Sequence, residues 1–484
     1  MSPASAGLKL RSLQGLLLIA IFLIALILRV EVARHLPSIE RPDEIFNTLE
    51  PAHHLAFGYG VVVWEWREGV RSWVFPAFLA GIMRATGWMA PGSQGYLTAI
   101  IIVLSLLSLT TVWFGYAWAK RASGNAAAVI AAGGCAIWYQ LVYFGPKALN
   151  EVVATAFLLP GLYLGMYAEE LGEEKKRLFL AGLFLGAAVS LRMQLLPAVA
   201  FAVLYFCRKR WASRAPAMLA GLLLIVVVSG LLDALTWSYP FQSYIGNFYV
   251  NIGKGRAATY GIAPWYWYIA KLVKSLWPLL LLALAGVRRN AVLGWVALII
   301  VASHSVIEHK EFRYVYPAIP VVITLAALGF VEIASALSAM RKSPLSPRAM
   351  VVAGLILFTL TSGIFARWFF RWGVGGGGLI AFDRLSRDPS LCAVGLYRLP
   401  WDLPGGYVHL HQNVPILLAN PNLSLDGQML NFNALLTRGP LVDPKMGFQS
   451  EGCWDGVCLY QRPGPCLTSP PLYEVNETLR LSDQ

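Results

Sequence analysis

The sequence predicts an all-α polytopic membrane protein with a small mixed α/β domain at its C-terminal end. Hydrophobic residues make up 57% of the chain, charged residues only 13%, and the mean hydropathy is +0.58. Soluble domains carry about a quarter charged residues, so these few charges cannot cover the surface of a soluble globule of 484 residues. Because every backbone amide must be paired internally inside a bilayer, we expect the apolar runs to be helices.

Apolar runs of transmembrane length recur along the first three quarters of the chain. We expect about eleven spans, at residues 12–30, 96–118, 125–144, 151–168, 178–191, 194–207, 215–236, 265–285, 291–306, 314–336 and 349–370. The first run has a basic start, but no small-residue cleavage site follows it, so we interpret it as a retained span. Residues 73–88 are also apolar, but a span there would invert every later loop, and we predict an interfacial or re-entrant helix instead.

The net charge of +13 is explained by membrane topology, and we exclude nucleic-acid binding. Basic residues gather in six connections, at 9–11, 120–121, 175–177, 208–214, 288–289 and 341–348. All six fall on one side of the membrane under the span count above, and the positive-inside rule makes that side the cytoplasm. We therefore expect a cytoplasmic N-terminus, with the large loop at 31–95 and the C-terminus on the extracytoplasmic side.

The tail of the chain differs in composition from the rest, with many Pro, Gly and Asn residues and only short apolar runs. We therefore divide the chain into a transmembrane domain at 1–372 and an extracytoplasmic domain at 373–484. Four of the six cysteines lie in the tail, at Cys392, Cys453, Cys458 and Cys466. An even set in an oxidising compartment predicts two disulfides of open connectivity; zinc is the less favoured alternative, since no paired CxxC occurs.

The loop at 31–95 concentrates acids, histidines and tryptophans beside the membrane. Carboxylates next to a bilayer are costly unless they serve a purpose. Asp43 follows Pro42 and so starts a turn or a helix; the alternative to a chemical role is that it caps that helix. Trp64 and Trp66 suit a sugar, but they suit the aromatic belt of a membrane protein equally well.

A second charged group lies in an outside connection between two spans and contains His309, Lys310 and Arg313. Lys310 and Arg313 can hold a lipid-linked phosphate, or they can form a helix-capping salt-bridge cluster, and the spacing does not choose between these readings. Arg192 lies in an apolar setting, where a charge needs a partner or water.

Lesser candidates are Lys147, Asn150 and Glu151, which lie between two spans. His409 and His411 have a spacing that two metal ligands on a strand can show, but we favour packing or substrate contact and predict no metal site.

Taken together, these segments resemble the family 22 glycosyltransferases, which are polyprenol-phosphate-mannose-dependent mannosyltransferases. In the first loop the matching elements are Pro42-Asp43-Glu44, Glu50 with Ala52-His53, Gly58-Tyr59-Gly60, Trp64-Glu65-Trp66 and Arg71-Ser72. The later matching elements are Arg192 with Gln194, His309-Lys310-Glu311, Arg313 and Tyr316-Pro317. The enzymes of the glycosylphosphatidylinositol anchor, especially the third mannosyltransferase, are most similar. Arg41 departs from the family's usual His, and Val63 from its common Thr.

The resemblance implies a GT-C type membrane fold and an inverting transfer of mannose, or a related hexose, from a polyprenyl phosphate to a glycolipid or glycan acceptor. It implies Asp43 as the general base, with Glu44 as second choice. The implied donor-phosphate ligands are Lys310, Arg313, His309, Arg192 and Arg41. The implied sugar or acceptor ligands are Glu50, His53, Trp64, Glu65, Trp66 and Arg71. A lipid phosphate leaves without a nucleotide, so no metal or cofactor is required.

Two other functions stay open at this point. A transporter or flippase of lipid-linked sugars would place polar residues near the bilayer midplane and show repeats, whereas here the polar clusters lie in outer loops. A catalytically inactive assembly subunit is kept open by Arg41. The Cys-rich tail resembles bacterial members of the family, which favours a bacterial inner membrane over the endoplasmic reticulum.

Overall fold

The computed structural model describes residues 3–340, 345–368, 370–420, 422, 425–441, 447–466 and 474–482. The chain forms two compact units. The bundle unit contains Met1–Val30 and Val103–Phe370, and the loop–tail unit contains Glu31–Ile102 and Arg371–Gln484. The first loop, which we had assigned to the membrane domain, is therefore grouped with the tail, and the buried hydrogen bonds described below account for this grouping.

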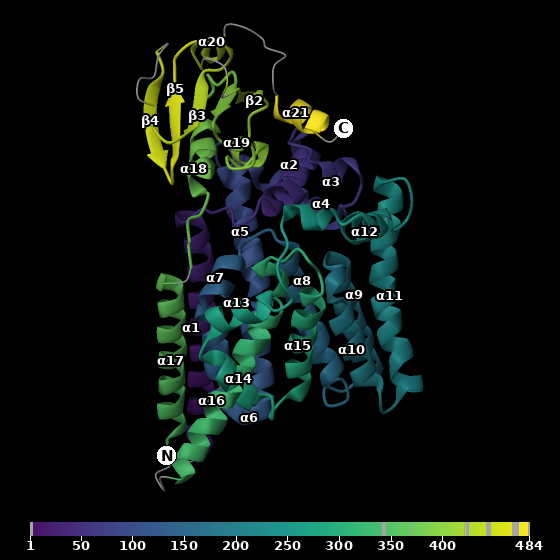
Figure 1. The fold of residues 1–484 in the computed structure, drawn as a ribbon. Helices are drawn as coiled ribbons and strands as arrows, with labels where there is room; N and C mark the ends of the chain where they lie inside the picture. Colours follow the sequence, from purple (N-terminus) through teal and green to yellow (C-terminus); the bar gives the residue numbers. More distant parts are fainter. Residues whose placement is uncertain are drawn as a thin grey trace. The chain divides into compact units, whose positions relative to one another are not determined.

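The bundle unit is built of helices joined by turns and loops, with no strand among its described residues (Figure 1). Its helices are α6 Thr110–Ile137, α7 Tyr139–Phe144, α8 Asn150–Met166, α9 Glu174–Leu191, α10 Leu196–Cys207, α11 Trp211–Thr236, α12 Gln242–Phe248, α13 Trp267–Leu276, α14 Leu279–Gly286, α15 Ala291–Ser305, α16 Ala318–Met340 and α17 Pro347–Trp368. Two further helices, α1 Pro3–His35 and α5 Gln94–Ser108, have residues in both units. Each predicted span overlaps at least one of these helices, and several of them are apolar enough to cross a membrane, which confirms a multi-pass membrane protein.

Five helical segments of the described chain are long and apolar enough to cross a membrane, or six if α13 and α14, bent by 102° against each other, count as one span. One of the five, Gln94–Ile137, holds two predicted spans, because Gly124 interrupts the helix with a φ of 79°. α8, α15 and the segment Met193–Cys207 are shorter apolar helices. Eleven crossings therefore remain a prediction, and the basic residues Arg341 and Lys342 used for the orientation lie outside the described residues.

Close helix packing in the bundle depends on small residues, as is common in membranes. A Cβ added to Gly286 of α14 would lie 1.9 Å from the Leu325 carbonyl oxygen, and one added to Gly329 of α16 would lie 1.8 Å from that of Leu282. These two helices therefore touch backbone to backbone.

The first-loop part of the loop–tail unit contains α2 Glu50–Phe57, α3 Trp64–Arg67 and α4 Val74–Thr86. α4 occupies the segment for which we predicted a helix that does not span. Its buried face includes Phe75, Leu79 and Met83, whereas Arg84 donates hydrogen bonds to the carbonyl oxygens of Ala56 and Leu55. An amphipathic helix of this kind packs one face on protein and leaves the other free.

The tail folds as the mixed α/β domain that we predicted. Its elements are α18 Gly376–Leu385, β1 Val394–Tyr397, α19 Tyr407–Leu410, β2 Ile416–Ala419, α20 Leu425–Gln428, β3 Ala434–Arg438, β4 Gln449–Trp454, β5 Val457–Gln461 and α21 Val475–Ser482. The sheet order is β2-β1-β3-β5-β4, with β1 parallel to β2 and β3, and β5 antiparallel to β3 and β4 (Figure 1, green to yellow). Leu417, Phe432, Leu435 and Tyr460 are among the residues of its apolar core.

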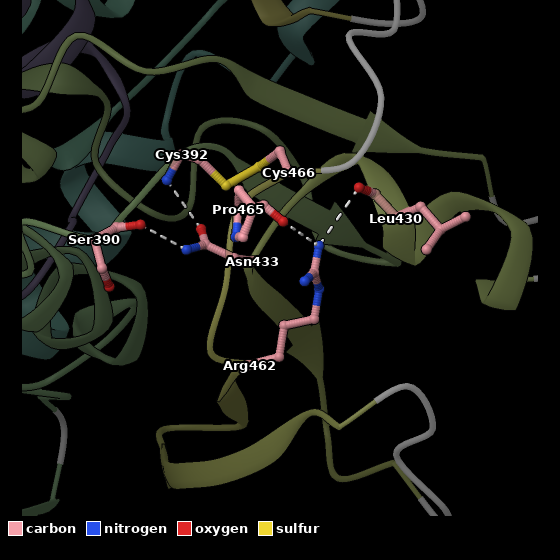
Figure 2. The surroundings of a disulfide bond; sticks show 7 residues. All are labelled: Ser390, Cys392, Leu430, Asn433, Arg462, Pro465 and Cys466. Atoms are coloured by element: carbon pink, nitrogen blue, oxygen red, sulfur yellow. Dashed lines mark hydrogen bonds between the residues drawn. A yellow bond between two sulfur atoms is a disulfide. The ribbon is translucent and has the colours of Figure 1, made fainter.

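The tail cysteines form two disulfides. Cys453–Cys458 joins the neighbouring strands β4 and β5, and Cys392–Cys466 joins the segment before β1 to the segment after β5. Figure 2 shows that Asn433 supports the second bond, since it accepts from the Cys392 amide at 3.0 Å and donates to the Ser390 carbonyl at 2.8 Å. All four cysteines are thus in disulfides, and no group of metal-binding side chains occurs among the described residues.

Candidate active site

Asp43 lies at the start of a helical run that continues through a π-helical turn, Ile45–Leu49, into α2. The Pro42 carbonyl accepts hydrogen bonds from the amides of Ile45 and Phe46, both at 2.9 Å. Asp43 and Glu44 are partly exposed, whereas Ile45 to Leu49 are buried. A carboxylate in the first helical turn is stabilised by the helix dipole, and π-helical turns are frequent at functional sites.

A polar cluster centred on the buried Glu65 lies within electrostatic reach of Asp43. Arg71 pairs with Glu65 at 3.5 Å, and the Asn47 amide donates to the same Glu65 oxygen at 3.5 Å. Burial raises the pKa of Glu65, Arg71 lowers it, and the negative charge of Asp43 raises it. The structure therefore brings Asp43, Glu65 and Arg71 together. Asn47 was missed by our sequence reasoning; its side-chain oxygen is buried and has no partner among the residues that the structure describes.

The two tryptophans of the Trp-Glu-Trp segment lie in different surroundings. Trp66 is buried and packs on Trp73, with ring centroids 4.4 Å apart. Trp64, at the start of α3, is partly exposed. Only Trp64 therefore offers a surface to a sugar in this conformation, and Trp66 supports the loop. Arg41 is exposed and precedes the helical run.

Glu50 is 0% exposed and joins the first loop to the tail. Its carboxylate accepts three backbone hydrogen bonds, from the amides of Val61, Tyr407 and Val408, each at 2.8 Å. Burial raises the pKa of Glu50 to about 7, although the three amides act in the opposite direction. A carboxylate enclosed in this way does not contact a sugar, so the binding role that we predicted for Glu50 is not supported.

His53 is also fully buried and makes a second link to the tail. Its Nδ1 donates to the Tyr59 carbonyl at 3.0 Å, and its Nε2 lies 3.0 Å from His411 Nδ1. Burial lowers the pKa of His53 to about 3, so the ring is neutral, Nε2 accepts, and His411 donates. His53 and His411 therefore pack together, and the sugar-binding role that we predicted for His53 gains no support from this buried position.

In the bundle unit, Glu151 at the start of α8 is the centre of a charged network. It is 1% exposed and pairs with Arg192 at 3.2 Å and with Arg313 at 3.3 Å. Arg313 Nε also donates to Glu311 at 2.6 Å. The two arginines are thus each balanced by a buried carboxylate. Sequence reasoning ranked Glu151 only as a lesser candidate, because its partners are distant along the chain.

Lys310, in the same connection, has a different environment. Its ammonium donates to the backbone carbonyls of Ala263 and Ile307 and makes no ion pair with a carboxylate within the described part of the chain. It is 7% exposed, and desolvation lowers its pKa. His309 lies beside it and contacts the Gly261 carbonyl at 2.9 Å and Glu311 at 3.3 Å. Lys310 thus keeps one N–H group for an anion.

The comparison with protein families decides what these clusters belong to. Residues 20–372 match the model of the Alg9-like mannosyltransferase family. The chain belongs to this family. The protein is therefore a glycosyltransferase. The matched region contains Asp43 and Glu65 of the first-loop cluster and Glu151 and Lys310 of the bundle cluster, so both clusters lie in the part of the chain that defines the family.

Relatives with names of their own agree with this family. The chain is 29% identical over 390 residues to GPI mannosyltransferase 3 of Yarrowia lipolytica, covering 78% of this chain and 72% of the relative. It is 26% identical over 468 residues to mannosyltransferase APTG1 of Arabidopsis thaliana, covering 89% and 81%. These relatives are eukaryotic, so they give no support to the bacterial membrane that we expected.

The fold is also known from a solved structure. ArnT from Cupriavidus metallidurans, solved with undecaprenyl phosphate, superposes with a TM-score of 0.60 at 10% identity, covering 96% of this Alg9-like chain and 99% of ArnT. The predicted GT-C architecture is therefore confirmed.

Proposed function

We propose that this protein transfers mannose from a polyprenyl-phosphate donor to a glycan or glycolipid acceptor on the extracytoplasmic face of the membrane, with inversion at the sugar carbon. The observation that carries the proposal is the cluster of Asp43, Glu65 and Arg71 at the start of a helical run. It offers one partly exposed carboxylate beside the buried Glu65, which is paired with the partly exposed Arg71. The ArnT structure contains undecaprenyl phosphate, a lipid phosphate of the kind that would leave in this transfer.

Asp43 acts as the general base in this proposal. The acceptor hydroxyl oxygen attacks C1 of the mannose, the bond from C1 to the phosphate oxygen breaks, and Asp43 takes the hydroxyl proton. The leaving polyprenyl phosphate keeps the electron pair of the broken bond. Arg71 neutralises Glu65, which limits the repulsion between Glu65 and Asp43 and lets both carboxylates remain in one cluster. Glu44 is the second choice for the base.

Lys310 stabilises the leaving phosphate. A phosphate that gains charge in the transition state is favoured by a positive group held in a poorly solvated place. Lys310 meets this description, whereas Arg192 and Arg313 already balance Glu151 and Glu311. We assign the two arginines to the support of the connection that carries Lys310 and His309. Lys310 and Asp43 belong to different units, and their assignment to one reaction rests on the family.

The test uses purified protein in liposomes with labelled polyprenyl-phosphate mannose and a membrane lipid extract as the acceptor source. We expect transfer by the wild type, and a loss of about a hundredfold or more in Asp43→Asn, since a positioned base contributes about 10²–10⁴-fold. The matched control is Glu451→Gln, an exposed acid on β4 of the same unit. Folded wild-type protein that transfers no mannose, or an Asp43→Asn variant as active as wild type, would refute the proposal.

A further inference from the structure

The loop after β1, residues 398–406, carries the pair Trp401 and Asp402 beside the helical run that begins at Asp43. The Trp401 ring packs edge-on against Phe46 with centroids 4.7 Å apart. Phe46 is three residues after Asp43, and its amide donates to the Pro42 carbonyl at 2.9 Å, so Asp43 and Phe46 lie on the same turn of the helical run. Trp401 is thus one side chain away from the turn that carries the proposed base.

Both side chains have unused binding capacity. Trp401 is partly exposed, and its indole N–H makes no hydrogen bond within the described part of the chain. Asp402 is also partly exposed and forms no ion pair or hydrogen bond with another described residue; partial burial raises its pKa. When a ligand covers a tryptophan, the indole N–H needs a hydrogen-bond acceptor, and when a ligand covers a carboxylate, its oxygens need donors in place of water. The hydroxyl groups of a sugar can supply both the acceptor and the donors.

The backbone of this loop is fastened to the first loop. Glu50 accepts from the amides of Tyr407 and Val408, directly after the loop. Gly406 has a φ of 69°, and a Cβ there would lie 2.9 Å from the Glu50 carboxylate. A loop that is already ordered loses less conformational entropy when a ligand binds. The hydrogen bonds to Glu50 therefore make this loop suited to bind a ligand.

We propose that Trp401 and Asp402 bind the acceptor sugar of the transfer reaction, the indole face against the apolar face of a hexose and the carboxylate on its hydroxyl groups. This inference rests on the proposed function and deepens it. The loop lies after residue 372, where the family model ends, so it lies outside the region that defines the family. A residue that selects the acceptor of this particular enzyme is expected in such a place.

The first test measures binding without turnover. Saturation-transfer NMR is recorded with octyl α-mannoside, octyl α-glucoside and octyl α-galactoside as probes, on wild type, Trp401→Ala, Trp401→Phe and Asp402→Ala. We expect a signal from at least one hexoside with wild type, its loss in Trp401→Ala and Asp402→Ala, and its retention in Trp401→Phe, which keeps a ring. No signal from any probe with wild type, or equal signals with wild type and Trp401→Ala, would overturn the inference.

The second test separates acceptor from donor in the liposome assay. In Trp401→Ala we expect the acceptor KM to rise about tenfold while the donor KM stays within about twofold. The control is Trp454→Ala. Trp454 is a partly exposed tryptophan of β4, and its ring packs against Arg384 of α18. A fall in kcat with an unchanged acceptor KM, or the same KM change in Trp454→Ala, would show a structural role. Failure of wild-type transfer would refute the proposed function instead.

Discussion

Replacing Glu50 tests the claim that the first loop and the tail are one folded unit. In Glu50→Ala, three buried amides, those of Val61, Tyr407 and Val408, lose their acceptor. A buried group left unsatisfied costs about 1–3 kcal/mol, so the change costs on the order of 3–9 kcal/mol. In Glu50→Gln one oxygen remains for two amides, while the side-chain NH2 group opposes the third, and the cost is about 1–3 kcal/mol.

The assay is hydrogen–deuterium exchange, read by mass spectrometry on peptides that cover residues 58–62 and 405–410. Since about 1.4 kcal/mol is a factor of ten in an opening equilibrium, Glu50→Gln should speed exchange in both peptides about fivefold or more, and Glu50→Ala by much more. Peptides of α16 in the bundle unit serve as internal references, and Glu451→Gln as the control protein. Unchanged exchange in both peptides of Glu50→Ala would refute the reasoning.

Two more predictions concern stability. Burial lowers the pKa of His53 from 6.5 to about 3. As the pH drops below about 6.5, His53 binds a proton in the unfolded state but not in the folded state, so its contribution to stability falls. At pH 5 this loss is about 2 kcal/mol. Glu50, whose pKa is raised to about 7, gains stability over the same pH range, so the prediction concerns the difference between two proteins. Unfolding of the loop–tail unit, followed by exchange at pH 7.5, 6.5 and 5.0, should lose more stability toward low pH in wild type than in His53→Asn; equal pH dependence in the two proteins would contradict the assignment. Glu151→Ala leaves Arg192 and Arg313 short of a counter-charge, and we expect a loss of about 3–5 kcal/mol, seen as a lower Tm in detergent. Glu151→Gln should lose less, and an unchanged Tm in both variants would show that the network is not stabilising.

The membrane helices and the mixed tail were predictable because their signals are local. Hydropathy over about twenty residues marks a span, and the change to Pro, Gly and Asn after residue 372 marks the tail. Asp43, Glu65 and Arg71 could be named because they lie close together in one loop. The structure pairs Arg71 with Glu65 and places Asp43 where its charge raises the pKa of Glu65.

The roles of Glu50 and His53 could not be predicted, because their partners are 357 and 358 residues away along the chain. The sequence shows only that a carboxylate and an imidazole occur in a polar loop, which is equally compatible with a ligand site. Glu151 was underrated for the same reason, since Arg313 follows it by 162 residues. Whether such a side chain stabilises the fold or binds a ligand depends on whether it is buried. Its burial depends on contacts between distant segments, which the sequence does not show.

The separation of 357 residues between Glu50 and Tyr407 also has a consequence for synthesis. Contacts between distant segments form late, and a chain emerges from the ribosome N-terminal end first. The loop that carries Asp43 therefore stays incomplete until the tail has been made and has reached the same side of the membrane. A chain stopped before residue 406 would leave the Glu50 carboxylate buried without two of its three partners, or exposed to water. The Glu50 contacts that join the first loop to the tail can therefore form only after residues 407 and 408 have been made.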